Sequence, residues 1–311
     1  MSSKRKLIST LLCVGALTAG LFVSGCGSDK TADKASSAVS SVTDSKSDEK
    51  LNKAFDELIK ATNEFNGNNV TWGQQHAENL AKLKAGFDEY AVNTQPRFEN
   101  LQNGLKKSKE IGNTYKEVDA ERDNVLAILD ELMPVYKELK SYTDSKAYLN
   151  DGKAKGNELA AKYVAAVEKF NAAYDKLGEV INTTNKEKNK KKMEQMKKDG
   201  YKNYAAVMEA TLRLTELVEK VQATYTNPDK AAIEKEIGEI QGLINGIDST
   251  DSAKESLSRN LNDTVGAIRQ VLVDPNDKYQ DRNLNRMIQQ YNSYIDSYNR
   301  TKPDALDGKK K

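Results

Sequence analysis

The sequence offers few side chains that could do chemistry on a substrate. His76 is the only histidine, which excludes a cage of histidine ligands for a metal and the paired Glu-x-x-His pattern of di-iron bundles. A lone histidine can act as a general base, but for His76, early in an expected helix, we expect a capping or surface role. No glycine-rich phosphate loop, Gly-x-Ser-x-Gly elbow or EF-hand loop occurs. We therefore expect a protein that is not an enzyme and that uses no cofactor or metal.

Cys26 is one of two cysteines, and its surroundings indicate attachment to a lipid. The basic residues 4–6 precede an apolar stretch over 7–23 and the small residues Ser24 and Gly25, which is the layout of a secretory signal. Val23-Ser24-Gly25-Cys26 resembles the bacterial lipobox, in which the cysteine thiol receives a diacylglyceryl group and the signal is removed just before it. The alternatives are an ordinary secretory signal with an incidental cysteine and an uncleaved anchor. All three interpretations export the chain.

Removal of residues 1–25 would change both the cysteine count and the charge. Cys13 would be lost with the signal and Cys26 would be alkylated, so the mature chain would have no free thiol for a disulfide, a metal or catalysis. Three of the 48 basic residues would also be lost, which leaves 45 against 46 acidic residues. A nearly neutral protein has no overall attraction to nucleic acid, and we expect no nucleic-acid partner.

The segment after the cysteine is expected to be a flexible linker over residues 26–47, because it is rich in Ser, Ala, Asp, Lys and Thr and has few large apolar residues. About 21 such residues span on the order of 25 Å. Residues 301–311 are expected to form a disordered basic tail. Gly27 follows the cysteine where an aspartate would retain a lipoprotein in the inner membrane. We therefore expect the outer membrane where there is one, and otherwise the outer face of the cytoplasmic membrane.

Residues 48–300 show helical periodicity and no sustained alternation of the kind that strands have. Apolar residues recur at steps of three and four, as in the stripes from Ile233 to Ile247 and from Leu257 to Leu272. The prediction is an all-α fold, an elongated antiparallel bundle of coiled-coil-like hairpins with about eight or nine helices. One domain is the first choice, and two bundles split near 186–200 are the alternative.

Breakers and caps predict where these helices end. The run Asn66-Gly67-Asn68-Asn69 is expected to end the first helix, and Pro134 to kink or break a later one. Asn227 before Pro228, and Ser252 with Glu255, are expected to cap two helices near the C-terminus.

Three groups of residues could form a surface for a ligand or partner. Trp72, expected in a loop over 70–73, either closes the end of the bundle or serves as a ligand platform. The tyrosines of the 291–300 segment either face a ligand or pack with hydrogen bonds at their edges. The lysine-rich run 186–202 is either a patch for anionic partners or a solvated helix. The candidates are Trp72, Tyr291, Tyr294, Tyr298, Lys190, Lys191 and Lys192.

The two ends of the helical region resemble a known family. Leu51-Asn52-Lys53-Ala54-Phe55 opens it, and the pattern Tyr-Asn-x-Tyr-Ile-Asp-x-Tyr-Asn over 291–299 closes it. Together with the lipobox and the length, these features are similar to the YiiG-like bacterial lipoproteins. The resemblance implies anchoring and helicity but transfers no active-site residue.

Two classes of function follow from these observations. The first is a non-catalytic envelope lipoprotein, anchored in the membrane through Cys26, whose helices bind another protein or support an envelope assembly. The second is an extracytoplasmic module that binds a small ligand or an anionic envelope polymer, and it predicts a concave site where aromatic side chains converge.

Overall fold

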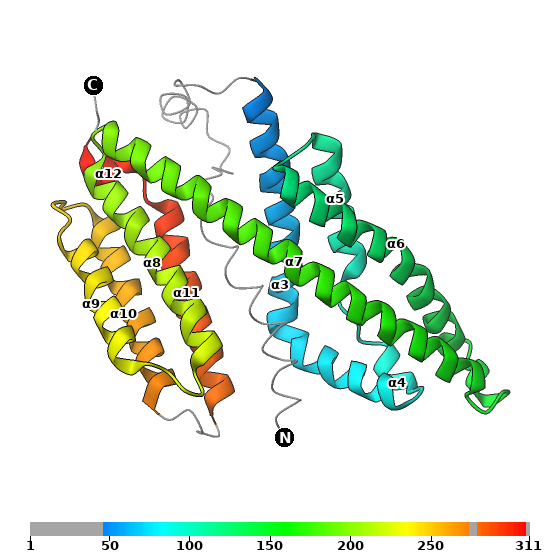
Figure 1. The fold of residues 1–311 in the computed structure, drawn as a ribbon. Coiled ribbons are helices and arrows are strands. Elements are labelled where there is room, and N and C mark those ends of the chain that lie inside the picture. The colour runs from blue at the N-terminus through cyan, green and yellow to red at the C-terminus, as the bar shows by residue number, and fades with distance from the viewer. Residues whose placement is uncertain (1–45, 274–278, 309–311) are drawn as a thin grey trace. The chain divides into compact units, whose positions relative to one another are not determined.

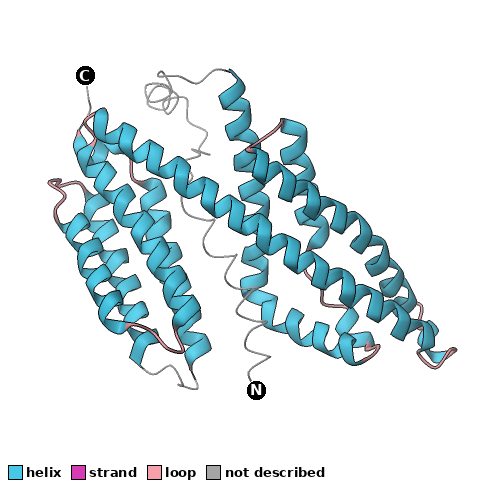
Figure 2. Cartoon of the chain, in the orientation of Figure 1, coloured by secondary structure: helices cyan, strands magenta, loops and turns pink. Residues whose placement is uncertain are grey.

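The computed structural model describes residues 46–273 and 279–308, and all regular structure in this part of the chain is helical (Figure 2). The all-α fold class is confirmed. The signal over 1–25, Cys26, most of the linker and residues 309–311 lie outside the described residues. The start of α3 at Lys46 falls within the last two residues of the predicted linker.

The N-terminal unit ends at Thr184. Figure 1 shows α3, α5, α6 and α7 as its long helices. The aromatic rings of Phe65, Phe98 and Phe170 meet in its core at centroid distances of 5.0–5.9 Å. Its elements are α3 (Lys46–Ala85), α4 (Glu89–Val92), α5 (Phe98–Ile111), α6 (Lys116–Asp144), the 3-10 helix η1 (Ala147–Leu149) and the first part of α7 (Ala154–Lys198).

The C-terminal unit begins at Asn185, within α7. It contains the end of that helix and five further helices, of which α8, α9, α10 and α11 lie side by side (Figure 1). Its core is mainly aliphatic, with Ile233, Ile240 and Ile268 fully buried. The helices are α8 (Lys202–Thr224), α9 (Lys230–Asn245), α10 (Ser252–Val273), α11 (Gln280–Arg300) and α12 (Pro303–Asp307).

The boundary between Thr184 and Asn185 gives two compact units, where the first choice from sequence was one bundle over 48–300. It lies next to the 186–200 stretch that was the alternative boundary. The boundary does not interrupt the backbone helix, because α7 continues through the lysine-rich run to Lys198. Apolar stripes report which residues face a core, but a continuous helix can supply stripes to two cores.

The run Asn66-Gly67-Asn68-Asn69 does not end a helix, so this expectation was wrong. α3 continues through it to Ala85 and bends along its course (Figure 1). Asn66 is buried, and its Oδ1 accepts a hydrogen bond of 2.9 Å from the Tyr174 hydroxyl on α7. Packing between helices therefore outweighs the weak helix propensity of Asn and Gly, which is at most about 1 kcal/mol per residue.

Of the expected kink or break at Pro134, the break does not occur, because α6 runs through Pro134 as one helix. Leu129 and Leu132 before the proline and Leu139 after it are all fully buried. Burial of an aliphatic side chain contributes about 1.5–3 kcal/mol. Several such contacts offset the missing hydrogen bond.

The tail over 301–311 is not a disordered basic tail where the structure describes it. Residues 303–307 form α12, and Leu306 is buried. The two carboxylate oxygens of Asp307 accept hydrogen bonds of 2.8 Å from the backbone N–H groups of Asn203 and Tyr204. Asp307 thus caps α8 from a distant part of the chain, a pairing that has no local sequence signal.

Two predicted N-caps are each displaced by a nearby aspartate. The α9 cap is Asp229, whose side chain accepts a bond of 3.0 Å from the backbone of Ala232, and not Asn227. Before α10, Asp251 accepts a bond of 2.8 Å from Ala253, in place of the box formed by Ser252 and Glu255. A carboxylate also interacts with the positive end of the helix dipole, which favours it at this position.

Candidate functional site

The tyrosines of α11 lie inside the C-terminal unit. Tyr291, Tyr294 and Tyr298 are at most 2% exposed. The Tyr294 hydroxyl lies 3.0 Å from Thr211 Oγ1, and the Tyr291 hydroxyl lies 2.8 Å from Thr215 Oγ1. Both threonines already donate to backbone carbonyls of α8, so the tyrosines are the donors. These side chains are therefore core residues and expose no ring to a ligand or partner.

Burial also changes the acidity of these tyrosines. Removal from water disfavours the phenolate and raises the pKa of Tyr294 to about 12, although the bond with Thr211 acts in the opposite direction. Tyr298 stacks on Tyr204 at a centroid distance of 6.2 Å, and burial raises its pKa well above the ordinary value. Burial therefore favours the neutral phenol at these positions.

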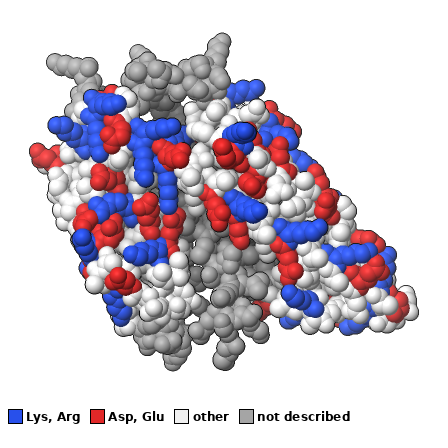
Figure 3. Space-filling model, viewed as in Figure 1, with Lys and Arg blue, Asp and Glu red and all other residues white. Residues whose placement is uncertain are grey.

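Most of the lysine-rich run lies in the last part of α7, which ends at Lys198, and Lys202 begins α8. Lys186 and Lys197 form ion pairs with α8, with Nζ–oxygen distances of 2.9 Å to Glu219 and 3.6 Å to Glu209. Lys190 and Lys191 are exposed, and Lys192 is half-buried and has an interaction partner. Positive and negative side chains are interspersed over the visible face of each unit (Figure 3). Lys190 and Lys191 are therefore the candidates for contact with an anion.

Trp72 and His76 both lie within α3, not in a loop or at the start of a second helix. Trp72 is 53% exposed, so it is accessible to a partner. His76 is buried, contrary to the expected capping or surface role, and burial lowers the pKa of its imidazole. Because α3 continues through 66–69, Trp72 and His76 lie in the middle of a helix and not near a helix end. Cys26, the proposed lipid attachment point, lies outside the described residues.

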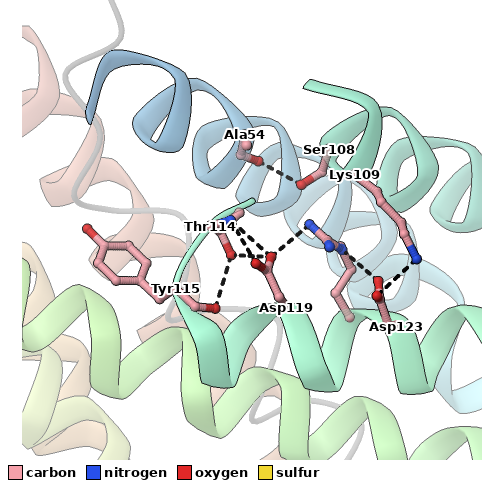
Figure 4. Close-up of polar contacts among 8 residues, drawn as sticks. Ala54, Ser108, Lys109, Thr114, Tyr115, Asp119 and Asp123 are labelled. Carbon is pink, nitrogen blue, oxygen red and sulfur yellow. Dashed lines mark hydrogen bonds and ion pairs between the residues drawn. The ribbon is translucent and has the colours of Figure 1, made fainter. Parts of the chain in front are cut away.

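A buried arginine lies in a cluster of polar contacts on α5 and α6. Arg122 is 1% exposed, and its guanidinium lies 2.9 Å from Asp119 Oδ1 and donates to Asp123 Oδ1 at 3.1 Å. Lys109 of α5 donates to the other Asp123 oxygen at 2.9 Å (Figure 4). Partial burial alone would raise the pKa of Asp123, but the bonds from Lys109 and Arg122 outweigh it and lower that pKa.

Neighbouring contacts extend this cluster and show what it does. Thr114 donates its backbone N–H and its hydroxyl to Asp119, which fixes the start of α6 (Figure 4). Ser108 of α5 donates to the backbone carbonyl of Ala54 in α3 at 2.7 Å. Each charge of the cluster has a partner of opposite sign, and Arg122 and Ser108 are buried. We interpret the cluster as a structural joint of three helices.

A depression of about 300 Å³ lies between α3 and α5. Its lining includes the apolar side chains of Phe65 and Leu101, and Glu64 and Arg97 supply charge. It is partly open to solvent and is at the lower end of the volumes of ligand sites. The aromatic candidates named from the sequence do not line it.

Sequence reasoning missed the most exposed apolar side chains of the N-terminal unit. Tyr90 is 78% exposed and Leu149 is 71% exposed. Leu149 directly precedes the turn Asn150-Asp151-Gly152. This position beside a turn is the local feature of the sequence that could have indicated its exposure.

Neither a metal-binding cluster nor a membrane span occurs in the part of the chain that the structure describes. In residues 46–273 and 279–308, no group of three or more His, Cys, Asp or Glu side chains could hold a metal ion. Among the helices of these ranges, none combines the length and apolar character needed to cross a bilayer.

Comparison with known proteins identifies a family. A family model described as Protein of unknown function (DUF3829) matches residues 70–301, which is more than half of the chain. The chain belongs to this family. The DUF3829 match covers parts of both units, from within α3 to the end of α11. No curated protein and no solved structure matches the chain. The family description names no activity or ligand, and the finer resemblance to YiiG-like lipoproteins stays a prediction.

Proposed function

We propose that the protein is exported and anchored to a membrane through lipid on Cys26, and that its helical units serve a non-catalytic, protein-binding or structural role in the bacterial envelope. The observation that carries the anchoring is Val23-Ser24-Gly25-Cys26 directly after a basic and then apolar segment. Burial of acyl chains contributes about 0.8 kcal/mol per methylene, so two or three chains hold a protein stably at a membrane. The YiiG-like resemblance agrees with this assignment.

The cysteine pair offers a matched test of the anchor. Cys26→Ser removes the thiol that would form the thioether, whereas Cys13→Ser changes a cysteine inside the apolar part of the signal. We expect Cys26→Ser to abolish incorporation of a labelled fatty acid and Cys13→Ser to leave it at the wild-type level. Equal labelling of the two variants would contradict the anchor.

The buried polar groups of the described residues bind one another, and these contacts support a non-catalytic role. The buried tyrosines of α11 bond to threonines of α8, and Arg122 pairs with two aspartates at a helix joint. Catalytic groups with shifted pKa values usually line a cleft, where they reach a substrate. These groups face neighbouring helices instead. Binding through exposed side chains is the function that this arrangement favours.

A second candidate function rests on the free lysines of α7. Lys190 and Lys191 are exposed and adjacent, so an anionic envelope polymer could contact both. The test uses inorganic polyphosphate as the probe, with Lys190→Glu/Lys191→Glu compared against Lys235→Glu, an exposed lysine of α9. Weaker polyphosphate binding in the double variant alone would favour this function. Equal binding by both variants would exclude this surface.

A further inference from the structure

The depression between α3 and α5 brings charged, polar and apolar side chains of the N-terminal unit to one small space, and we call it the α3–α5 pocket. Its volume is about 300 Å³. The polar side chains at its rim are exposed, and the apolar side chains at its floor are buried. The rim consists of Glu64 and Gly67 of α3 with Arg97 and Asn100 at the start of α5, and the floor includes Phe65 and Leu101.

The floor of the α3–α5 pocket is held in place by the aromatic core behind it. The Phe65 ring lies 5.9 Å from the Phe98 ring and 5.2 Å from the Tyr174 ring, centroid to centroid. Leu101 is also buried. A floor that is already packed loses little conformational entropy when a ligand binds. Because Phe65 and Leu101 present only their edges to the pocket, the apolar part of a matching ligand is short.

The α5 side of the pocket offers hydrogen-bond donors that the fold itself does not use. Arg97 precedes α5 and gives it no side-chain cap. Among the described residues, none forms an ion pair with Arg97 or a side-chain hydrogen bond with Asn100. A guanidinium presents two parallel N–H groups that match the two oxygens of a carboxylate, and an asparagine amide adds a further donor. These two side chains therefore favour a ligand with a carboxylate.

The α3 side of the pocket carries the opposite charge. The Glu64 carboxylate lies 4.0 Å from the Lys60 ammonium, and both side chains are exposed. Exposed ion pairs contribute little to stability, so the ammonium group of a ligand can take the place of Lys60. Within the described residues, no ion pair joins Glu64 to Arg97. Glu64 repels a ligand with only a negative charge and Arg97 repels one with only a positive charge, so the pocket favours a ligand that carries both.

We infer that the α3–α5 pocket binds a free α-amino acid with a short apolar side chain, such as alanine. Arg97 and Asn100 donate to its carboxylate, and Glu64 accepts hydrogen bonds from its ammonium group. The methyl group lies against Phe65 and Leu101. In a peptide these two charges are separated by the chain, so a free amino acid fits so small a space better. The pocket is shallow, and we expect a dissociation constant on the order of 1 mM.

The experiment titrates alanine into the full-length protein in detergent and follows the methyl NMR signals of Ala61, which also lines the pocket, and Leu101. Lactate, which has a hydroxyl in place of the ammonium group, and ethylamine, which lacks the carboxylate, are the comparison ligands. We expect both to bind at least tenfold more weakly than alanine. Arg97→Gln and Glu64→Gln should each weaken alanine binding at least tenfold. Arg259→Gln, at an exposed arginine of the C-terminal unit, is the matched control and should leave it unchanged.

A glycine at the rim allows the pocket to be filled. A Cβ on Gly67 would meet nothing within 4 Å, so a side chain at this position can enter the pocket without displacing a neighbour. Gly238 of α9 is equally open and lies in the other unit. We expect Gly67→Leu to weaken alanine binding at least tenfold and Gly238→Leu to leave it unchanged. Circular dichroism of each variant controls for folding.

Several outcomes would overturn the amino-acid site. One is that neither methyl signal changes up to about 20 mM alanine, well above the expected dissociation constant. Lactate or ethylamine binding as tightly as alanine would show that the pocket does not select a ligand with both charges. Unchanged binding by Gly67→Leu, or by the Arg97 and Glu64 variants, would place the alanine elsewhere. Each of these results leaves the lipid anchor and the protein-binding role untouched, because neither uses this pocket.

Discussion

The two units of this protein differ in the kinds of side chain that they bury in their cores. The N-terminal unit packs aromatic rings edge to face, as Phe65, Phe98 and Phe170 do, and it holds a buried arginine. The C-terminal unit packs isoleucine stripes and places tyrosine hydroxyls on threonines. Aromatic packing depends on a few large contacts, whereas aliphatic stripes spread the same burial over many small ones. The N-terminal unit should therefore be more sensitive to changes at single close contacts.

The largest expected effect comes from one glycine in each unit. A Cβ on Gly104 of α5 would lie 2.4 Å from the Cβ of Ala61 in α3, whereas a Cβ on Gly238 of α9 would meet nothing within 4 Å. We expect Gly104→Ala to lower the free energy of unfolding by about 1–3 kcal/mol because the two helices must separate. Gly238→Ala should raise it by about 0.5–1 kcal/mol through helix propensity.

Urea unfolding followed by Trp72 fluorescence measures the first variant, because the only tryptophan lies in the N-terminal unit. Circular dichroism follows the second variant. Equal effects of the two substitutions would show that α3 and α5 do not approach as closely as described.

The next effect concerns the cap that α12 gives to α8. Asp307→Ala should lower the free energy of unfolding of the C-terminal unit by about 1–2 kcal/mol, because two backbone N–H groups lose a charged acceptor. Hydrogen exchange at Asn203 and Tyr204 should become faster. Asp296→Ala, an exposed position on α11, is the control. Unchanged exchange at both amides would mean that Asp307 is not the cap.

A smaller effect on stability is expected at the buried tyrosines of α11. Tyr294→Phe removes one buried hydroxyl and should cost about 1 kcal/mol of unfolding free energy. A double-mutant cycle with Thr211→Val should give a coupling of about 0.5–1.5 kcal/mol, measured by urea unfolding. If the two substitutions were strictly additive, the hydrogen bond across α8 and α11 would contribute nothing to stability.

The smallest effect is a pH dependence in the N-terminal unit. Partial burial, together with repulsion from Glu179, raises the pKa of Asp175 to about 6. Above pH 6 the folded protein must hold a charge that the unfolded chain holds more easily, and below about pH 3 the group is neutral in both states. Asp175→Asn should therefore raise the free energy of unfolding at pH 7.5, by less than about 1 kcal/mol because the group is half exposed.

That advantage of Asp175→Asn should fall as the pH drops from 6 to 4 and be absent at about pH 3, below the pKa of the group in both states. Thermal unfolding at pH 7.5 and about pH 3 measures it. Glu179→Gln should give a smaller change of the same sign. An advantage that grows on acidification would contradict the raised pKa.

The C-terminal unit was the easier one to predict from the sequence. Its stripes from Ile233 to Ile244 and from Leu257 to Leu272 became buried faces because each belongs to a single helix and core, and Ile247, just beyond α9, is buried too. In the N-terminal unit the same reasoning ended a helix at Asn66, where a buried bond to Tyr174 keeps the helix going. Such a bond joins residues that are far apart in sequence, and no local pattern reports it.

The candidate site was predicted less well than the fold. Tyrosines at positions 291, 294 and 298 do share one helix face, but periodicity alone cannot say whether that face meets a core or a partner. Leu149 and Tyr90 were missed because single apolar residues near turns are common in sequences. Their exposure follows from the packing around them, which only the three-dimensional arrangement shows.

The central functional claim is that lipid on Cys26 holds these helices at a membrane. Its most direct test is mass spectrometry of the N-terminal peptide of the mature protein isolated from membranes. We predict a chain that begins at Cys26 and carries a diacylglyceryl group on the thiol. A mature chain that begins at any other residue, or at an unmodified Cys26, would contradict the account.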